Sequence, residues 1–390
     1  MKLHRPRIAV INHTIGRPSE VWVERQCLSF SRIEPIMMGW SLHPSWQNTG
    51  GIKTYTIPGL FEPPRTFGRQ VQAKLGMAAS RRTTKTQQKF LQEALNRANV
   101  EGVLCHFAWT AMAVSQAVSG NIPLLWHIHG RDVSKLMEIR SYRAMLAQQL
   151  PSASALIAVG HHQVEKLAHL GLPETTEIIP CGAPFQTFST FPVPERASGQ
   201  PIRFISVGRL TPEKGTLKTL AAFEQLITEY PNAEWVCIGD GPEMGVLNER
   251  VKSGSARAKI NLLGLQSPEN IAYELSRAHV FLQHSLPFEG SVEGFGVSLT
   301  EAGASGLPLV VSHLGGILDQ VKDGKNGFLF EPGDTNSQAN IMLKVSRDEN
   351  LRHRLGNNAR VVSKTFDSAL MSQKLEATII DTIAHHKECE

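Results

Sequence analysis

Short apolar runs alternate with longer amphipathic stretches along most of the chain, and this alternation restricts the fold more than any other feature. The apolar runs of the first half lie at 8–12, 36–39, 102–106, 123–129 and 155–159. Those of the second half lie at 202–207, 235–238, 260–263, 280–283 and 308–312. Strands that alternate with helices predict parallel sheets covered by helices on both faces. We therefore expect an α/β fold made of doubly wound domains.

The alternation stops in one proline-rich segment, which marks a boundary between domains. Its prolines are Pro184, Pro192, Pro194 and Pro201. Loss of periodicity together with proline is typical of a linker, and the 390 residues are about twice the usual length of one domain. We predict four segments: a first Rossmann-like domain at 1–185, a linker at 186–200, a second Rossmann-like domain at 201–367, and a C-terminal helix at 368–390 that packs back on the first domain.

The charge of the chain is mild overall but uneven. A formal net charge of +5 does not indicate a nucleic-acid partner. No acidic residue occurs from Pro63 to Gln92, whereas basic residues are frequent there: Arg65, Arg69, Lys74, Arg81, Arg82, Lys85 and Lys89. This 65–89 basic segment predicts contact with anionic phosphate, on a membrane lipid or on a substrate. A solvated helix face is the alternative.

Cysteines, apolar runs and histidines restrict the compartment and the cofactors. The five cysteines are scattered without a Cys-x-x-Cys pair, which favours a reducing cytoplasm. The stretch Ile8–Ile11 is too short for a signal-peptide core. No apolar run approaches the ~20 residues that span a bilayer, so we expect any membrane contact to be peripheral. No helical i, i+4 pair of histidines has a third ligand, so we expect no metal site.

The densest motif is FEGSVEGFGVSLTEAGASGLP, from Phe288 to Pro308. It places Glu293 and Glu301 eight positions apart around a Gly-Phe-Gly loop that opens a helix. Glycines let backbone amides approach an anion, and the helix dipole favours negative charge there. Carboxylates on either side can accept hydrogen bonds from sugar hydroxyls. The motif thus predicts a phosphate and sugar site, and a glycine-rich helix start with solvated glutamates is the alternative.

Two other motifs follow strands of the second half. VGRLTPEKG places Arg209 and Lys214 across a tight turn, where each could contribute ~1.5–3 kcal/mol by binding a diphosphate; an ordinary surface loop is the alternative. GDGPEMG, from Gly239 to Gly245, has the spacing G-x-G-x-x-x-G and lacks the acidic residue expected about 20 positions later in a nicotinamide site. We interpret it as a tight turn needed for packing.

In the first half, the motif WHIHGRDV, from Trp126 to Val133, lies at the end of an apolar strand. His129 and Asp132 are expected at the carboxyl edge of the sheet, where ligands bind. His127 alternates to the same side of the strand as His129. One of the two histidines can therefore serve packing while the other serves function, and we predict that His129 is functional.

Together these stretches resemble the retaining glycosyltransferases of family 4, particularly the bacterial exopolysaccharide and lipopolysaccharide types. The resemblance is strongest between Ile202 and Glu331, where VGRLTPEKG, IGDGPE, LLG, EGFGVSLTEAGASGLPLV and GGILDQVKDGKNGFLFEPGD follow in the family's order. It implies the GT-B fold, with two Rossmann-like domains facing across a cleft and a nucleotide-sugar-binding second domain. The N-terminal loop HTIGRPSEVW departs from the family's Gly-Gly pair and keeps only Gly16.

The resemblance also implies roles for individual residues. The catalytic residues would be His129, Arg209, Lys214 and Glu293. Glu293 would contact the transferred sugar, Glu301 the ribose, and His129 the donor sugar from the opposite domain. The residues that bind the donor would be Gly16, Gly208, Arg209, Lys214, Leu263, Gly264, Glu293, Gly294, Phe295, Gly296, Val297 and Glu301.

The function so implied is transfer of a hexose-type sugar, with retention, from a UDP- or GDP-sugar. The acceptor would be a hydroxyl of a glycan or of a polyprenyl-diphosphate-linked intermediate of surface-polysaccharide synthesis, at the inner face of the membrane. We expect no cofactor and no metal. The alternatives are transfer to a soluble small molecule, a sugar-nucleotide epimerase, a non-catalytic nucleotide-sugar-binding subunit and, least favoured, a nicotinamide dehydrogenase.

Overall fold

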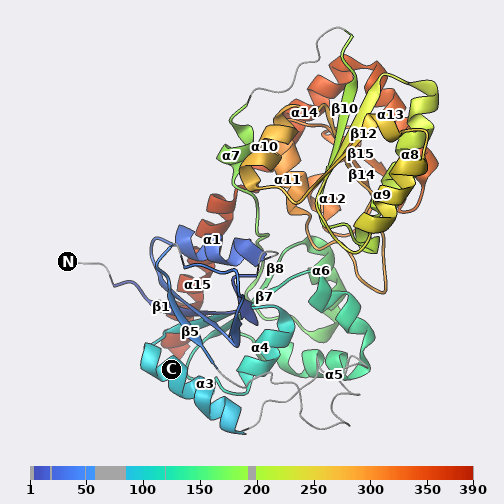
Figure 1. Ribbon diagram of the computed structural model, residues 1–390. Coiled ribbons are helices and arrows are strands. Elements are labelled where there is room, and N and C mark those ends of the chain that lie inside the picture. The colour runs from blue at the N-terminus through green and yellow to red at the C-terminus, as the bar shows by residue number, and fades with distance from the viewer. Residues whose placement is uncertain are drawn as a thin grey trace. The chain divides into compact units, whose positions relative to one another are not determined.

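The computed structural model describes residues 4–17, 20–48, 50–57, 85–118, 120–191 and 199–389. The chain forms two compact units, each shown with its own sheet in Figure 1. The first unit comprises residues 1–181 and 369–390, and the second comprises residues 182–368.

The first unit contains a seven-stranded parallel sheet in the order β5-β3-β1-β6-β7-β8-β9, with a small β2-β4 pair beside it. Its strands are β1 (Arg7–Ile11), β2 (Thr14–Ile15), β3 (Glu34–Gly39), β4 (Ser41–Leu42), β5 (Lys53–Thr56), β6 (Gly102–His106), β7 (Leu124–Ile128), β8 (Ala155–Ala158) and β9 (Thr176–Ile178). Its helices are α1 (Val21–Ser29), α3 (Lys85–Ala98), α4 (Ala108–Ser115), α5 (Arg140–Gln149), α6 (His161–Leu167) and α15 (Ser368–Cys389).

Strand β1 shows how the sequence builds this unit. Its alternate side chains point to opposite faces of the sheet. Ala9 and Ile11 belong to one hydrophobic cluster, whereas Ile8 and Val10 belong to another. A strand that is buried on both faces has a continuous apolar sequence. The run at 8–12 predicted such a strand, in a sheet covered on both faces.

The C-terminal helix α15 belongs to the first unit (Figure 1). Leu375 and Ile379 are fully buried in the same cluster as Ile8. The Glu376 carboxylate accepts hydrogen bonds from the backbone amides of residues 32 and 33, at 2.5 and 3.1 Å, and from the Ser31 hydroxyl at 3.2 Å. A buried carboxylate satisfied in this way fixes the helix in one register.

The second unit contains a six-stranded parallel sheet in the order β12-β11-β10-β13-β14-β15. Its strands are β10 (Ile202–Val207), β11 (Ala233–Ile238), β12 (Ile260–Gly264), β13 (Val280–Gln283), β14 (Leu309–Ser312) and β15 (Gly327–Phe330). Its helices are α7 (Phe185–Ser189), α8 (Thr216–Glu229), α9 (Met244–Ser253), α10 (Pro268–Ser276), α11 (Val297–Ala304), α12 (Ile317–Gln320), α13 (Thr335–Arg347) and α14 (Glu349–Lys364). Phe204 and Ile205 of β10 enter different hydrophobic clusters, so both faces of this sheet are covered as well.

The linker predicted at 186–200 differs from the structure, in which the second unit already begins at residue 182. Helix α7 occupies the first part of the predicted linker. Phe188 is 2% exposed within the second unit's core, and its carbonyl oxygen accepts a hydrogen bond from the Ser305 hydroxyl at 3.1 Å. A helix of five residues is too short to show periodicity in the sequence, so the prolines that follow it dominated the prediction.

Helix α3 begins at Lys85, near the end of the 65–89 basic segment. Most of the 65–89 basic segment lies outside the described residues, which include only Lys85 and Lys89 of its cations. Within the described part of the chain, no helix combines the length and the apolar character needed to cross a membrane.

Candidate active site

Lys214 and Glu293 form an ion pair at the carboxyl edge of the second unit's sheet. The Lys214 ammonium lies 2.5 Å from Glu293 Oε2, and the two side chains are only 20% and 13% exposed. Lys214 ends a short turn that follows β10, and Glu293 lies in the loop after β13. Because β10 and β13 are neighbouring parallel strands, both loops leave the sheet at the same edge.

One oxygen of Glu293 receives three hydrogen bonds. Oε2 accepts from Lys214, from the Gln283 amide at 3.1 Å and from the Ser285 hydroxyl at 3.1 Å. Burial alone would raise the pKa of Glu293, but the charge of Lys214 and the hydrogen bonds from Lys214 and Ser285 hold that pKa below its ordinary value. Among the described residues no hydrogen bond reaches Oε1, which leaves this oxygen for a hydroxyl of a ligand.

The loop after Glu293 is fixed through its carbonyl groups before it enters α11. Gln320 Nε2 donates to the carbonyl oxygens of Phe295 and Gly296, and the amide of Gly316 donates to the carbonyl of Glu293 at 3.0 Å. Gly296 precedes the helix with φ +82°, a conformation that favours glycine. The first amides of a helix have no partner within it, so the start of α11 suits an anionic group.

Arg209 and Lys214 line one pocket with Gly208, but the two cations are held differently. The Arg209 side chain is 64% exposed and lies 3.5 Å from Glu213, a loose pairing compared with that of Lys214. Gly215, directly after Lys214, has φ +58°, and a Cβ there would lie 2.0 Å from the carbonyl oxygen of His284. The turn therefore lies against the loop after β13.

The other predicted donor residues of the second unit lie around the same edge. Gly294 belongs to the fixed loop, Val297 is the first residue of α11, and Glu301 lies one turn further along. Leu263 and Gly264 end β12. The Phe295 ring is buried edge-on against Phe366, with ring centroids 5.3 Å apart. Phe295 thus offers the site its backbone, whereas its ring packs in the core.

The GDGPEMG motif serves packing, as predicted. A Cβ on Gly239 would lie 1.8 Å from the carbonyl oxygen of Gly208, and one on Gly241 would lie 2.4 Å from that of Leu210. These glycines let the loop after β11 approach the loop that carries Arg209.

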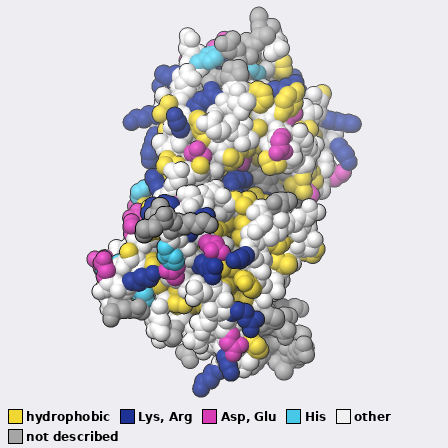
Figure 2. All heavy atoms as spheres, turned by 90° about the vertical axis from the view of Figure 1, so that its left-hand side faces the viewer, with side chains coloured by type: hydrophobic (Ala, Val, Ile, Leu, Met, Phe, Trp, Pro, Cys, Tyr) yellow, Lys and Arg dark blue, Asp and Glu magenta, His cyan; other side chains and the backbone are white. Residues whose placement is uncertain are grey.

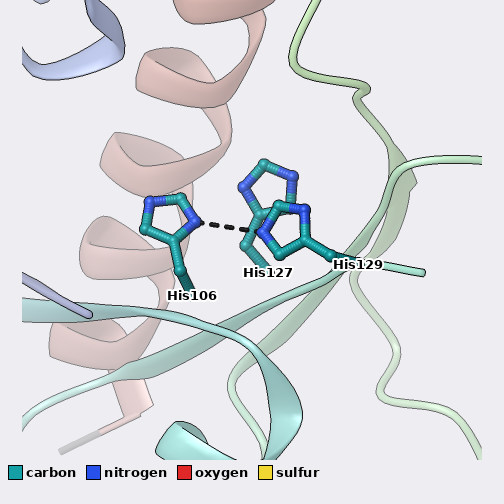
Figure 3. Close-up of side chains that lie close together, drawn as sticks. All are labelled: His106, His127 and His129. Carbon is teal, nitrogen blue, oxygen red and sulfur yellow. Dashed lines mark hydrogen bonds between the residues drawn. The ribbon is translucent and has the colours of Figure 1, made fainter. Parts of the chain in front are cut away.

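In the first unit, His129 is part of a buried cluster of three histidines, shown in Figure 3. His106 and His127 are direct partners in the register of β6 and β7, and His129 follows β7. His106 Nδ1 and His129 Nε2 are 3.3 Å apart and share a hydrogen bond. Burial lowers the pKa of all three, that of His127 to about 4, so the rings are neutral at pH 7.

Asp132 fixes the backbone around this cluster. Its carboxylate accepts hydrogen bonds from the amide of His129 at 2.9 and 3.1 Å and from the amide of Ala108 at 2.8 Å. Burial raises the pKa of Asp132 to about 7, although these backbone hydrogen bonds act in the opposite direction. Asp132 therefore joins the end of β7 to the start of α4 and acts on the backbone of His129.

A separate cavity of about 320 Å³ lies within the first unit, and the predicted donor residue Gly16 lines it. A Cβ on Gly16 would lie 2.0 Å from the Trp46 ring, so glycine admits the indole at this wall. Trp46 Nε1 donates to Glu24 Oε2 at 3.1 Å. Glu24 Oε1 is buried and, within the described residues, has no hydrogen-bond partner.

The sequence reading missed the residues that support these groups. Two polar residues hold Glu293: Gln283, which ends the run at 280–283, and Ser285. A polar Gln-x-Ser at a strand's carboxyl end is a usable signal. His106 also ends a predicted strand. Trp46 and Glu24 gave no signal, because they meet only through the packing of α1 against the loop after β4.

Two family models match the chain. The model described as Glycosyl transferases group 1 matches residues 189–362, and the model described as Glycosyltransferase Family 4 matches residues 54–186. An N-acetyl-alpha-D-glucosaminyl L-malate synthase of Bacillus anthracis is 25% identical over 317 residues, which are 76% of this chain and 79% of that protein. A putative colanic acid biosynthesis glycosyltransferase of Salmonella typhimurium is 27% identical, covering 65% and 63% of the two chains.

A UDP-Gal:alpha-D-GlcNAc-diphosphoundecaprenol alpha-1,3-galactosyltransferase of Escherichia coli is 29% identical over 185 residues, covering 47% of this chain and 46% of that one. Among solved structures, HepE of Anabaena in complex with UDP superposes with a TM-score of 0.76 at 16% identity, covering 96% of this chain and all of that one. Sucrose-phosphate synthase of Thermosynechococcus elongatus gives 0.77 at 18% identity, with 98% and 100% covered. The chain belongs to the family 4 glycosyltransferases with the GT-B fold, enzymes that transfer sugars from nucleotide-sugar donors.

Proposed function

We propose that the second unit binds a UDP- or GDP-linked hexose and that the sugar is transferred with retention at its anomeric carbon. The observation that carries the donor site is the Lys214–Glu293 pair, whose carboxylate keeps one oxygen without a partner among the described residues. Lys214 and Arg209 would bind the diphosphate, and Glu293 Oε1 would accept a hydrogen bond from a hydroxyl of the sugar.

In the proposed step, the bond from the anomeric carbon to the diphosphate oxygen breaks. The acceptor oxygen forms its bond on the same face of the sugar, and the acceptor's proton passes to the departing phosphate. Negative charge grows on the diphosphate as the bond breaks. Lys214, Arg209 and the amides at the start of α11 would stabilise that charge more strongly than they stabilise the bound donor, which lowers the barrier.

We propose that His129 contacts the donor sugar from the first unit. Because its Nε2 shares a hydrogen bond with His106 Nδ1, Nδ1 is the nitrogen it would offer to a sugar hydroxyl.

The cations proposed to face the diphosphate are side chains, so we further propose that transfer needs neither a metal ion nor a cofactor. Activity that survives treatment with EDTA supports this proposal, and loss that only added Mg²⁺ or Mn²⁺ restores contradicts it.

The reaction is tested with the nucleotide sugar that most raises the melting temperature of the protein, since a ligand selective for the native state stabilises it. NMR of the product made from an α-linked donor should show an α-linkage; a β-linkage contradicts retention. Release of an epimerised nucleotide sugar without acceptor would instead support the epimerase.

We propose that the acceptor is a glycan whose terminal sugar enters the cavity of the first unit. The cavity is lined by Trp46 and by the carboxylates Glu20 and Glu24, and Glu24 Oε1 has no partner among the described residues. An indole and carboxylates suit a polyhydroxylated ring. Trp46→Ala should raise KM for the acceptor at least tenfold while KM for the donor changes little. Equal changes in both constants would contradict an acceptor site in this cavity.

We also propose that the acceptor is linked to a polyprenyl diphosphate and that the enzyme works at the cytoplasmic face of a membrane. On the face shown in Figure 2, lysine and arginine side chains are spread among acidic ones. The 65–89 basic segment, which contains no acidic residue, is our candidate for contact with anionic lipid. The protein should co-sediment with anionic vesicles at low salt and not with neutral ones. Failure to sediment with anionic vesicles contradicts membrane contact.

A further inference from the structure

We propose that His106, His127 and His129 form a binding site for one divalent transition-metal ion of the zinc class. One ring nitrogen of each histidine lies within 4.8 Å of the corresponding nitrogens of the other two. The residues are 0%, 0% and 8% exposed, and Figure 3 shows their rings close together, with the hydrogen bond between His106 and His129. The site goes beyond the proposed sugar transfer, which requires no metal.

The hydrogen bond of His127 identifies the nitrogen that it would offer to a metal. Its Nε2 donates to the carbonyl oxygen of Ile179 at 3.1 Å, so Nε2 carries the proton and Nδ1 holds a lone pair. Nδ1 is buried and has no hydrogen-bond partner among the described residues. Histidines that bind metals generally donate their other nitrogen to a carbonyl or carboxylate in this way.

The spacing of the other two histidines matches an edge of a tetrahedral site. His106 Nδ1 and His129 Nε2 are 3.3 Å apart. Two nitrogens at zinc's usual Zn–N distance of ~2.0–2.1 Å are about 3.4 Å apart in a tetrahedral site. When the ion binds, the proton that lies between these two rings would move to the other nitrogen of its own ring, so both rings stay neutral.

Core packing explains part of this cluster but leaves two nitrogens without a role. The His106–His129 hydrogen bond and the contacts with Trp22, whose ring centroid lies 4.5 Å from that of His129, are ordinary features of a core. However, His106 Nε2 and His127 Nδ1 are both buried without a partner among the described residues. Buried polar atoms are seldom left unsatisfied, and a metal ion would satisfy His127.

The ligands also restrict the metal. Three neutral imidazoles suit Zn²⁺, Co²⁺, Ni²⁺ or Cu²⁺, whereas Mg²⁺ and Ca²⁺ prefer oxygen ligands. Asp132 is close in sequence, but its carboxylate already accepts hydrogen bonds from backbone amides. Three protein nitrogens would leave the fourth tetrahedral position for water.

The test uses the full chain, stripped of metal and titrated with Zn²⁺ against a chromogenic chelator. All proteins carry Cys389→Ser, because Cys389 Sγ lies 3.8 Å from His385 Nε2 and this exposed pair could itself bind zinc. The variants are His106→Asn and His127→Gln, of which the second keeps an amide that can donate to Ile179. The control is His161→Asn, an exposed histidine of the same unit.

We expect one equivalent of Zn²⁺ to bind the parent protein and the His161→Asn control with the same affinity. Each cluster variant should bind at least tenfold more weakly. Unchanged affinity in His127→Gln, or no binding by the parent, would overturn the proposal. X-ray absorption of the Zn²⁺-loaded parent does not depend on any variant folding: three imidazole ligands support the site, and fewer than three contradict it.

Discussion

In the proposed donor site, the two oxygens of the Glu293 carboxylate have different roles. Glu293 Oε2 accepts hydrogen bonds from Lys214, Gln283 and Ser285, so Oε1 remains for the proposed contact with the sugar. A carboxylate held by three hydrogen bonds keeps its position when the nucleotide sugar leaves. This favours catalysis because less reorganisation is needed in the transition state. Lys214 supports Glu293, and in the proposed reaction it would also bind the diphosphate.

Replacing Lys214 should reduce catalysis far more than it reduces stability. We expect Lys214→Ala to lower kcat by roughly 10²–10³, the usual effect of removing one donor that faces developing negative charge. Steady-state kinetics measure this effect. Lys252→Ala is the matched control, since Lys252 is a 64% exposed lysine of the same unit. Equal activity in the two variants would exclude Lys214 from the site.

Acid should destabilise the first unit through its buried histidines. The pKa values of His106, His127 and His129 are lowered in the folded state, so the unfolded chain binds more protons between pH 6.5 and about 4. Stability is therefore lost as the pH falls through this window. Asp132 acts in the opposite direction. Because its pKa is raised to about 7 in the folded state, the folded protein binds this proton before the unfolded chain does, which offsets about one of the three histidine protons. The net slope is roughly 2–3 kcal/mol per pH unit near pH 5.

Denaturant unfolding between pH 7 and pH 5, followed by tryptophan fluorescence, measures this slope. Trp235→Phe removes the tryptophan of the second unit and leaves Trp22, Trp40, Trp46, Trp109 and Trp126 in the first. His127→Gln should reduce the slope by the contribution of about one proton, because the variant lacks one of the three buried histidines. A free energy of unfolding that stays constant from pH 7 to pH 5 would show that these histidines are not buried as neutral groups.

Individual site residues could be predicted from the sequence where a motif carried them. Lys214 and Glu293 stood in recognisable stretches, and parallel strands bring the ends of such stretches to one edge. The support from Gln283 was not predicted, because a side-chain amide can point in many directions and only packing selects one. The cluster of His106 with His127 depends on strand register, which a single sequence does not specify.

At the scale of elements, the donor loop is positioned by a close backbone contact. A Cβ on Gly316 would lie 2.0 Å from the carbonyl oxygen of Gly294, in the loop that leads to α11. The glycines before α12 therefore pack directly against the backbone of residues 293–296 and limit how far it can move. Such close approaches require glycine for space alone, since Gly316 has an ordinary φ of −67°.

Gly316→Ala should therefore displace the donor loop and lower kcat/KM for the donor at least tenfold. The control is Gly245→Ala in α9, where a Cβ would meet no atom within 4 Å. Alanine is the better helix former, so this control should gain roughly 0.5–1 kcal/mol of stability and keep full activity. Kinetics and thermal melts separate the two. Wild-type kinetics in Gly316→Ala would show that the contact does not position the loop.

The order of strands and helices followed from hydrophobic periodicity, because strands buried on both faces are unmistakable apolar runs. The edge strands β9 and β15 were not predicted, and neither was helix α7. The five residues of α7 bury Phe188 in the second unit, and the boundary predicted from prolines lies later in the chain than the boundary of the folded units.

At the scale of the whole molecule, the chain returns to its first unit after completing the second. Residues 369–390 pack with the N-terminal strands, and Glu376 satisfies backbone amides near β3. The sequence indicated this helix, and its contacts show why the first unit needs it: the unit's second hydrophobic cluster includes Met371, Leu375, Ile379 and Ile383.

Deleting residues 369–390 should therefore destabilise the first unit and leave the second folded. We expect the tryptophan fluorescence of the truncated chain to lose the first unit's cooperative transition, while a nucleoside diphosphate still raises the melting temperature of the remainder. A truncated chain that melts like the full one would show that α15 is dispensable for the first unit.

Sugar transfer as proposed requires the second unit to hold the diphosphate with Lys214 and the sugar with Glu293. Calorimetric titration of wild type, Lys214→Ala and Glu293→Gln with both the nucleoside diphosphate and its nucleotide sugar tests this most directly. We predict that Lys214→Ala weakens both ligands at least tenfold, whereas Glu293→Gln weakens only the nucleotide sugar. Unchanged binding of the diphosphate to Lys214→Ala, or equal losses for both ligands in Glu293→Gln, would contradict the proposed donor site.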